Sequence, residues 1–252
     1  MGSKDKISKE IKEIIDLNRT GLEQAYVEPM VGGANMIDKI KGVRIAADNN
    51  KYLIAMWQGL QQGLIYPKEI SKQMYDNAKS DFKNGSNVFY SDFLIGWIGF
   101  MASFNGKFYN GYASDYIDGK NKKIQYDRNY IDESIRNIET QIQLIKDIEF
   151  YCCDYSQLII PEKSIIYCDI PYNDTTKYRT NIFDYPTFYD WAELKSEEGH
   201  KVFISEYWMP ESRFTKIWQK KIKSNLSTKT QNKIECLFIP RKQIINQYAT
   251  LF

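Results

Sequence analysis

The 252-residue sequence predicts an α/β fold with a largely parallel sheet and a second segment inserted between its strands. Three observations favour this class. Short apolar, β-branched runs alternate with amphipathic helical patterns, which is the order that parallel sheets require. Several of these runs end at an acidic residue, as 164–168 does at Asp169. Between about 60 and 130 the alternation stops, and Gly, Asn, Lys and aromatic residues become frequent.

The first elements follow from the spacing of apolar residues. Ile11, Ile14 and Ile15 share one face of a helix, opposite charged residues. The first strand then ends at Glu28, and the second ends at Asp48. In chain order, we expect a helix at 8–17, a strand at 25–27, a helical turn or two at 35–40, a strand at 44–47 and a helix at 51–60.

After the inserted segment the alternation resumes. Isoleucines recur every three or four residues from Ile131 to Ile148, which places them on one core-facing side of a helix. The last strand is expected to pair antiparallel at the sheet edge. The expected elements are a helix at 129–148, strands at 149–153, 164–168, 201–205 and 233–239, and a helix at 185–194. Together they predict a Rossmann-like main domain of 1–59 and 130–252, with a mainly helical and loop-rich insertion at 60–129.

Composition excludes several classes of protein. Hydrophobic residues make up 43% and charged residues 26%, which is ordinary for a globular chain and unlike a disordered one. The 34 basic and 32 acidic residues leave a net charge of +2, so a nucleic acid would have to bind a local basic patch. The longest uncharged apolar stretch, 93–104, is too short to cross a bilayer, and the N-terminal residues lack a secretory pattern. The four cysteines lack metal-ligand spacing. We therefore expect a cytoplasmic protein with reduced thiols, no membrane partner and no metal.

The turn after the first strand is the first candidate binding site. Glycines at 32 and 33 let a backbone approach a ligand closely, and Asp48 stands where an acid can accept hydrogen bonds from ribose hydroxyls. The turn lacks a phosphate-binding glycine pattern, so S-adenosylmethionine fits best, with a plain glycine turn as the alternative. Asp154 follows the next strand end and is expected near the cofactor adenine, although it would also suit an ordinary strand end. The expected cofactor residues are Glu28, Pro29, Met30, Val31, Gly32, Gly33, Ala34, Asn35, Asp48, Asn49, Asp154, Tyr155 and Asp169.

The sharpest chemical signal is Asp169-Ile170-Pro171-Tyr172, where an apolar strand stops at an acid and a proline-stiffened turn presents an aromatic ring. The exocyclic amine of a base is a poor nucleophile because its lone pair is delocalised into the ring. Hydrogen bonds from its two N–H groups to the Asp169 carboxylate and the Ile170 carbonyl would favour a pyramidal nitrogen, while Tyr172 would stack on the base. A strand-to-loop turn with a packed tyrosine is the alternative. His200, the only histidine, is expected in a turn.

These motifs, in this order, resemble those of the Dam-like DNA adenine-N6 methyltransferases. The resemblance rests on Glu28-Pro29-x-x-Gly32, Asp48, Asp154-Tyr155 and Asp169-x-Pro171-Tyr172, which corresponds to the family's D-P-P-Y motif. Met1-Gly2-Ser3-Lys4 is similar to the family's N-terminal element, which implies that Lys4 lies near the cofactor and the active site. The resemblance implies methyl transfer from S-adenosylmethionine to adenine N6 in DNA. It also implies that 1–59 and 130–252 are catalytic and that 60–129 recognises the target.

Three residues depart from the family pattern. Met30 replaces a usual Phe, Ala34 replaces a usual Gly, and Ile170 replaces the first Pro of D-P-P-Y. Ile170 keeps the carbonyl that the mechanism uses, so we expect activity to survive. The Cβ of Ala34 is tolerable if its φ is not positive.

A DNA substrate requires further groups, because an adenine inside a duplex must be flipped out and its phosphates need cations. Basic residues lie among aromatic residues in the insertion, directly after the catalytic turn, and again between 213 and 233. Taken singly, most are expected to be solvated surface charges. The expected DNA-binding residues are Asn105, Lys107, Lys120, Lys122, Lys123, Arg128, Lys177, Tyr178 and Arg179.

Two other functions stay open from the sequence. One is methyl transfer to an RNA base or another planar amide, although related N-P-P-Y enzymes have Asn where Asp169 stands. The other is a catalytically silent DNA-binding relative, against which the retention of Asp48, Asp169, Pro171 and Tyr172 argues.

Overall fold

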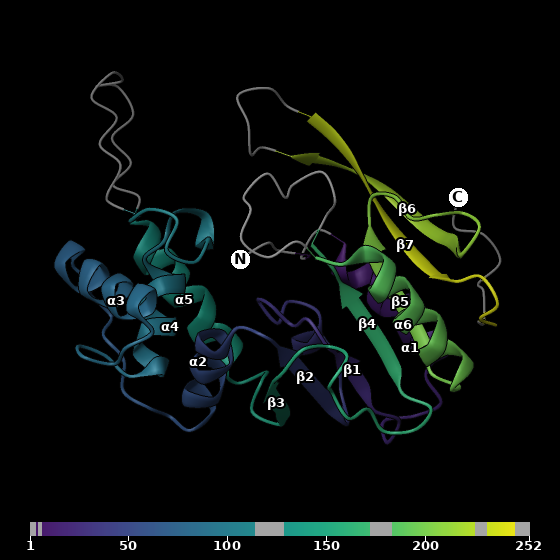
Figure 1. The fold of residues 1–252 in the computed structure, drawn as a ribbon, viewed down its shortest axis with the longest axis horizontal. Coiled ribbons are helices and arrows are strands. Elements are labelled where there is room, and N and C mark those ends of the chain that lie inside the picture. The colour runs from purple at the N-terminus through teal and green to yellow at the C-terminus, as the bar shows by residue number, and fades with distance from the viewer. Residues whose placement is uncertain (1–3, 5–6, 114–128, 172–182, 225–230, 245–252) are drawn as a thin grey trace. The chain divides into compact units, whose positions relative to one another are not determined.

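The computed structural model describes residues 4, 7–113, 129–171, 183–224 and 231–244 (Figure 1). By their contacts the residues form two compact units, one containing 50–152 and the other containing 3–49 and 153–252. None of the helices among the described residues has the length and apolar composition that a membrane span requires. The boundaries of the target-recognition insertion stay a prediction.

The unit of 3–49 and 153–252 is built on a mixed sheet. Within this unit the strand order is β2-β1-β4-β5-β7-β6. The first four strands are parallel, and β7 runs antiparallel to both β5 and β6. The α/β class predicted from the sequence is therefore confirmed, with the Rossmann-like arrangement in which β1 lies beside both β2 and β4. The strands are β1 (Tyr26–Glu28), β2 (Arg44–Asp48), β4 (Ile165–Asp169), β5 (Lys201–Glu206), β6 (Phe214–Ser224) and β7 (Gln231–Pro240).

Helices cover both faces of this sheet. One face, with Val27, Ile166 and Ile204, packs against α6 (Tyr185–Glu197) in a continuous apolar core. On the other face lies α1 (Ser8–Asn18), whose last carbonyl accepts a hydrogen bond from Lys201 Nζ at 3.0 Å. A short 3₁₀ turn, η1 (Ile37–Lys39), stands where helical turns are expected at 35–40.

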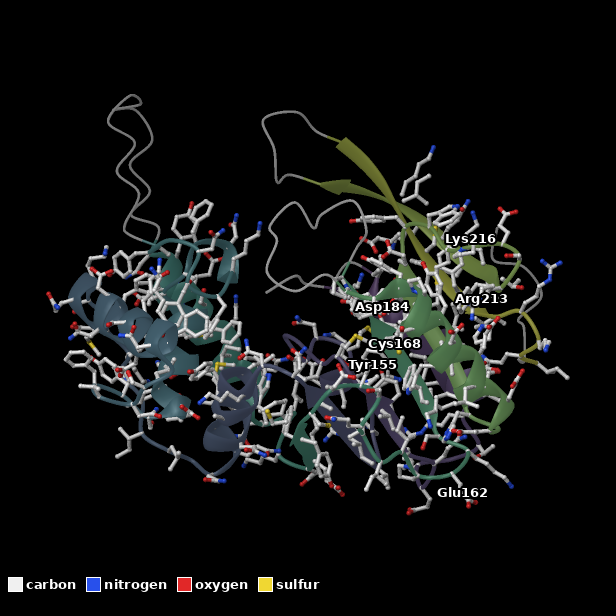
Figure 2. All side chains as sticks on the ribbon, viewed as in Figure 1. Tyr155, Glu162, Cys168, Asp184, Arg213 and Lys216 are labelled. Atoms are coloured by element: carbon white, nitrogen blue, oxygen red, sulfur yellow. The ribbon has the colours of Figure 1, made fainter. Side chains whose placement is uncertain are left out.

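The sheet edge differs from the sequence prediction. The strand expected at 233–239 is β7, and it is paired on both sides because β6 lies outside it. Most of β6 belongs to the basic stretch between 213 and 233, which was considered as a source of cations for DNA phosphates. Two of those cations form ion pairs within the protein. Arg213, labelled in Figure 2, pairs with Asp190 and Glu193 of α6. Lys220 pairs with Glu10 of α1. Lysine-rich edge strands are common because exposed charge discourages pairing with other chains.

The unit of 50–152 is mainly helical. Its helices begin at side-chain caps, as Ser71 Oγ accepts from the Met74 amide at 3.2 Å and Ser91 Oγ from the Leu94 amide at 3.4 Å. The helix expected at 129–148 ends at Ile142, but Ile145 and Ile148 beyond it are still buried. The elements are α2 (Lys51–Gln61), α3 (Lys72–Asn84), α4 (Asp92–Met101), η2 (Phe104–Gly106), α5 (Tyr130–Ile142) and β3 (Ile148–Cys152).

Much of the high aromatic content packs inside this helical unit. Phe108 stacks on Phe100 with ring centroids 4.5 Å apart and meets Phe82 edge-on at 5.0 Å. Tyr109 is 5% exposed, and its hydroxyl donates to the Ile95 carbonyl at 2.7 Å. Phe108 and Tyr109 are among the aromatic residues of the insertion that lie close in sequence to the expected DNA-binding cations. Their rings instead stabilise the fold.

Candidate active site

Three acidic residues end three neighbouring parallel strands. Glu28 ends β1, Asp48 ends β2 and Asp169 ends β4, and β1 lies between the other two strands. In open α/β sheets, ligands bind outside these carboxyl ends. The fold thus brings the predicted cofactor and catalytic residues to one edge of the sheet from segments far apart in the sequence.

The glycine turn after β1 folds back onto β2. The Val31 amide donates to the Ala47 carbonyl at 2.8 Å, and the Gly32 amide donates to Asp48 Oδ2 at 3.2 Å. Gly32 has a φ of +46°, and apart from its chain neighbours no atom of the described residues lies within 4 Å of the position that a Cβ would take there. The turn therefore leaves open space beside the Asp48 carboxylate, as a bound nucleoside would require.

Ala34 adopts a backbone conformation with positive φ, which is unfavourable for a residue that has a Cβ. Its φ is +55°, and the residue is fully buried. A Cβ in the left-handed region costs about 1–2 kcal/mol. The condition under which this side chain was expected to be tolerated is therefore not met, and the chain carries local strain at a position where glycine would carry none.

Glu28 is enclosed beneath the turn. It is 4% exposed, and Tyr26 Oη donates to its Oε1 at 2.7 Å. Burial raises the pKa of Glu28 well above its ordinary value, and the nearby Asp169 carboxylate adds to this rise. Glu28 is therefore a buried support of the strand ends. Of the remaining turn residues, Pro29 and Val31 are buried, Met30, Gly33 and Asn35 are half-buried, and Asn49 after β2 is exposed.

The residues after β3 have mainly local contacts. The Asp154 carboxylate accepts from the Ser156 amide at 2.9 Å, which forms an Asx turn. The ring of Tyr155 meets Trp191 and Phe188 of α6 edge-on at 5.1 and 5.5 Å, and it packs against the core that contains Cys168 (Figure 2). Their contact with a cofactor adenine stays a prediction.

Asp169 stands beside a buried cation. Lys4 Nζ lies 3.1 Å from Asp169 Oδ1 and 3.1 Å from Glu235 Oε2 of β7. Burial raises the pKa of the Asp169 carboxyl, with a further rise from Glu235, and Lys4 opposes both effects. Lys4 thus lies beside Asp169, the residue predicted to be catalytic. Sequence reasoning missed Glu235, although an acid inside the apolar run 234–239 is a detectable signal of a buried charged partner.

The rest of the catalytic turn is described as far as Pro171. Ile170 is 1% exposed, and its side chain packs in the apolar core that also contains residues of α6. The exposed Pro171 offers its carbonyl to Tyr185 Oη at 2.6 Å. Tyr172 lies outside the described residues.

Only two of the expected DNA-binding residues are described. Asn105, in η2, and Lys107, just after it, are both exposed. Lys120, Lys122, Lys123, Arg128, Lys177, Tyr178 and Arg179 lie outside the described residues. His200 is buried as a structural residue, and its Nδ1 accepts from the Ser164 amide at 3.1 Å.

Comparison with known proteins identifies the family. The sequence profile of the D12 class N6 adenine-specific DNA methyltransferases matches residues 1–138, which is more than half of the chain. The chain belongs to this family. The match contains Lys4, the glycine turn and Asp48, whereas Asp169 lies beyond it.

Other comparisons are distant. No curated protein matches at a significant level. Among solved structures, the rRNA methyltransferase aviRa from Streptomyces viridochromogenes is similar at 8% identity with a TM-score of 0.38, covering 93% of this chain and 84% of its own. As a D12 class methyltransferase, the protein is an enzyme of DNA adenine methylation.

Proposed function

We propose that this D12 class enzyme transfers the methyl group of S-adenosylmethionine to N6 of an adenine flipped out of duplex DNA. The observation that carries the proposal is the position of Asp169, which ends β4 one strand away from the glycine turn and contacts a buried ammonium. A carboxylate at that edge faces the place where a nucleoside cofactor would lie.

The residues present suit the cofactor. The missing Cβ at Gly32 leaves open space, and the Asp48 carboxylate beside it can accept hydrogen bonds from ribose hydroxyls. When bound, S-adenosylmethionine supplies an electrophilic methyl group on a positively charged sulfur. Glu28 to Asn35 would wrap its methionine part, and Asp154 would approach its adenine.

The chain's own residues prepare the acceptor amine. The Asp169 carboxylate accepts a hydrogen bond from one N–H of the N6 amine, and the Ile170 carbonyl accepts one from the other. These hydrogen bonds expose the nitrogen lone pair. Tyr172 stacks on the target base. As the new N–C bond forms, the methyl–sulfur bond breaks and N6 loses one proton, which leaves through the Asp169 carboxylate to water. Asp169 acts through charge placement in a closed site and needs no strong basicity.

The test is transfer of labelled methyl groups from S-adenosylmethionine to three acceptors: duplex DNA free of adenine methylation, RNA and protein. We expect label in DNA, recovered as N6-methyladenine, and loss of at least a hundredfold in rate in Asp169→Asn. Glu162→Gln is the matched control, because Glu162 is an exposed acid beyond the opposite end of β4 (Figure 2). It should retain full activity.

Three results would contradict the proposal. Label that enters RNA alone would assign the enzyme to another base substrate. Full activity of Asp169→Asn would remove the catalytic role of this carboxylate. A protein that binds DNA without any methyl transfer would be a silent relative in which the strained turn at Ala34 no longer supports catalysis.

A further inference from the structure

Lys4 is held between two carboxylates that come from distant parts of the chain. Its Nζ is 3.1 Å from an oxygen of Asp169 and 3.1 Å from an oxygen of Glu235. The side chains of Lys4 and Glu235 are 8% and 7% exposed, whereas that of Asp169 is 35% exposed. The Glu235 carboxylate is therefore enclosed with the ammonium, whereas the Asp169 carboxylate is accessible to a ligand.

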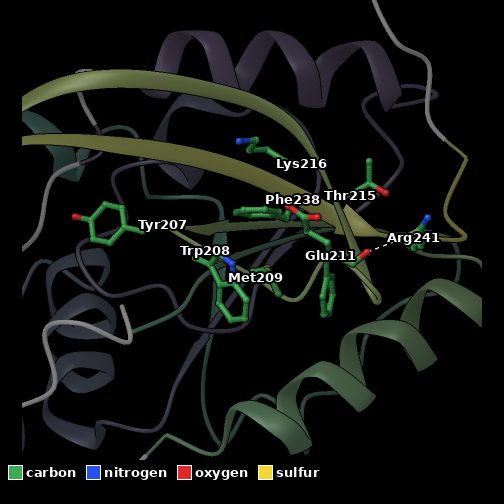
Figure 3. Close-up of a pocket in the computed structure, with 9 residues that line it drawn as sticks. Tyr207, Trp208, Met209, Glu211, Thr215, Lys216, Phe238 and Arg241 are labelled. Carbon is green, nitrogen blue, oxygen red and sulfur yellow. Dashed lines mark hydrogen bonds between the residues drawn. The ribbon is translucent and has the colours of Figure 1, made fainter.

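Both ends of the Lys4–Glu235 pair are fixed by the fold. The Lys4 carbonyl accepts from the Ile7 and Ser8 amides at 2.9 and 2.7 Å, at the start of α1. Glu235 lies on β7, which is paired on both sides. Burial and the nearby Glu235 carboxylate raise the pKa of Tyr207, so the two side chains are close neighbours. Tyr207 stands at the edge of a cavity of about 330 Å³, and its hydroxyl points away from the other lining residues, such as Trp208 and Met209 (Figure 3).

The charges of this cluster are unequal. One ammonium faces two carboxylates, so the group carries one excess negative charge while both acids are ionised. Burial and Glu235 raise the pKa of Asp169, and Lys4 lowers it. The Asp169 carboxylate also helps to raise the pKa of its titratable neighbours Glu28 on β1, Tyr167 and Cys168 on β4, and Tyr207 after β5.

We propose that Glu235 is a positioning residue for the methyl transfer, which holds the Lys4 ammonium between two carboxylates and so keeps Asp169 available to the substrate amine. Without the Glu235 charge, the ammonium would be drawn more strongly to Asp169 and would neutralise more of its charge. A carboxylate whose charge is more fully neutralised by a cation is a weaker acceptor for an N–H group, because less negative charge remains to attract the donor. The inference rests on the function proposed above.

The most direct measurement is the pKa of Asp169, followed by carbon-13 NMR in protein labelled at the aspartate carboxyl carbons and assigned with Asp169→Asn. We expect Glu235→Gln to lower the pKa of Asp169 by about half a unit to one unit, because it removes a nearby negative charge. Glu235→Asp, which keeps that charge, should stay close to the wild type. Glu162→Gln is the matched control, because it removes an exposed acid beyond the opposite end of β4 (Figure 2).

Methyl-transfer kinetics supply a second readout. In Glu235→Gln the acidic limb of the rate profile should move to lower pH by the same amount, and the plateau rate should fall roughly five- to tenfold with thermal unfolding little changed. An unchanged pKa of Asp169 in Glu235→Gln would overturn the inference, whatever the activity. A shifted pKa in a protein that methylates nothing would instead overturn the proposed function and leave the charge coupling in place. If Glu235 had only a structural role, Glu235→Gln would lower the unfolding temperature and would change neither the pKa of Asp169 nor the acidic limb of the rate profile.

Discussion

At position 34 the chain carries a methyl group in a backbone conformation that favours glycine. Ala34 has a φ of +55° and no exposed surface, so neither solvent nor a neighbouring turn relieves the strain. The resemblance to the family implies glycine at this position, but the φ of a turn residue depends on how the turn docks. Here docking is set by the Val31 and Gly32 amides, which bind the end of β2.

Ala34→Gly should therefore stabilise the protein. Relief of the left-handed strain is worth about 1 kcal/mol, partly offset by the greater entropy of an unfolded glycine, and corresponds to roughly 2–4 °C in melting temperature. Differential scanning calorimetry measures the change. The control is the same substitution at Ala78, a buried residue inside helix α3, which should destabilise by a similar or larger amount. Destabilisation by Ala34→Gly would show that the Cβ contributes useful packing.

Glu28 gives a stability effect that depends on pH. Its pKa in the folded protein is raised well above the ordinary value by burial, so the folded state binds its proton more tightly than the unfolded state does. Stability from this group is therefore fully present below the unfolded pKa of about 4.3 and is lost as pH rises through the folded value.

Glu28→Gln keeps an oxygen for the Tyr26 hydroxyl and removes this dependence. We expect the variant to exceed the wild type in unfolding free energy at pH 8, with the difference shrinking towards pH 5. Chemical denaturation at the two pH values measures it. A constant difference between the two would mean that Glu28 does not titrate in this range.

Among the elements, the contact between α2 and α4 depends on small residues. A Cβ built on Gly96 of α4 would lie 2.1 Å from the Tyr52 carbonyl oxygen of α2, which is a backbone atom that a rotamer change cannot move. On the same pair of helices, a Cβ on Gly59 would lie 2.2 Å from the Phe93 ring. Glycine thus lets the two helices approach closely.

Gly96→Ala should force α2 and α4 apart and cost about 1–3 kcal/mol of stability. Gly21→Ala is the matched control, because Gly21 has open space around its Cβ position and should change stability by less than about 0.5 kcal/mol. Urea denaturation of both variants tests the contrast. Equal stability of Gly96→Ala and the wild type would mean that the helices can separate without loss of packing.

Whether an element could be predicted depends on the pattern of apolar and polar residues in its sequence. Strand β4 is apolar and β-branched and ends at an acid, so its sequence indicates a buried parallel strand. Strand β6 is rich in lysine because it is an edge strand, and its sequence therefore lacks the apolar pattern by which a strand is predicted. Helices α3 and α4 lie in the insertion that was predicted to be mainly helical and loop-rich, but no individual helix was predicted there, although Ser71 and Ser91 are typical helix caps.

For the molecule as a whole, the order of the motifs predicted that Glu28, Asp48 and Asp169 meet, because carboxyl ends of neighbouring parallel strands share one edge. The contact between Lys4 and Glu235 was not predictable in this way. Its partners are 231 residues apart, and it depends on where β7 enters the sheet.

Binding of S-adenosylmethionine should stabilise the folded protein. At a hundredfold excess over its dissociation constant, a ligand that binds only the folded state adds about 2.7 kcal/mol, or roughly 5–10 °C for a chain of this size. Asp48→Ala should reduce this shift strongly, and Glu162→Gln should keep it. Thermal shift at graded ligand concentrations measures both. A shift that Asp48→Ala leaves intact would place the cofactor elsewhere.

The crystal structure of the protein bound to S-adenosylhomocysteine tests the central claim most directly. We predict density for the ligand outside the carboxyl ends of β1, β2 and β4, with its ribose at Asp48, its amino-acid part along the turn that contains Gly32, and its sulfur facing Asp169. Ligand density in the cavity beside Trp208, or side chains filling the space beside Gly32, would contradict the account.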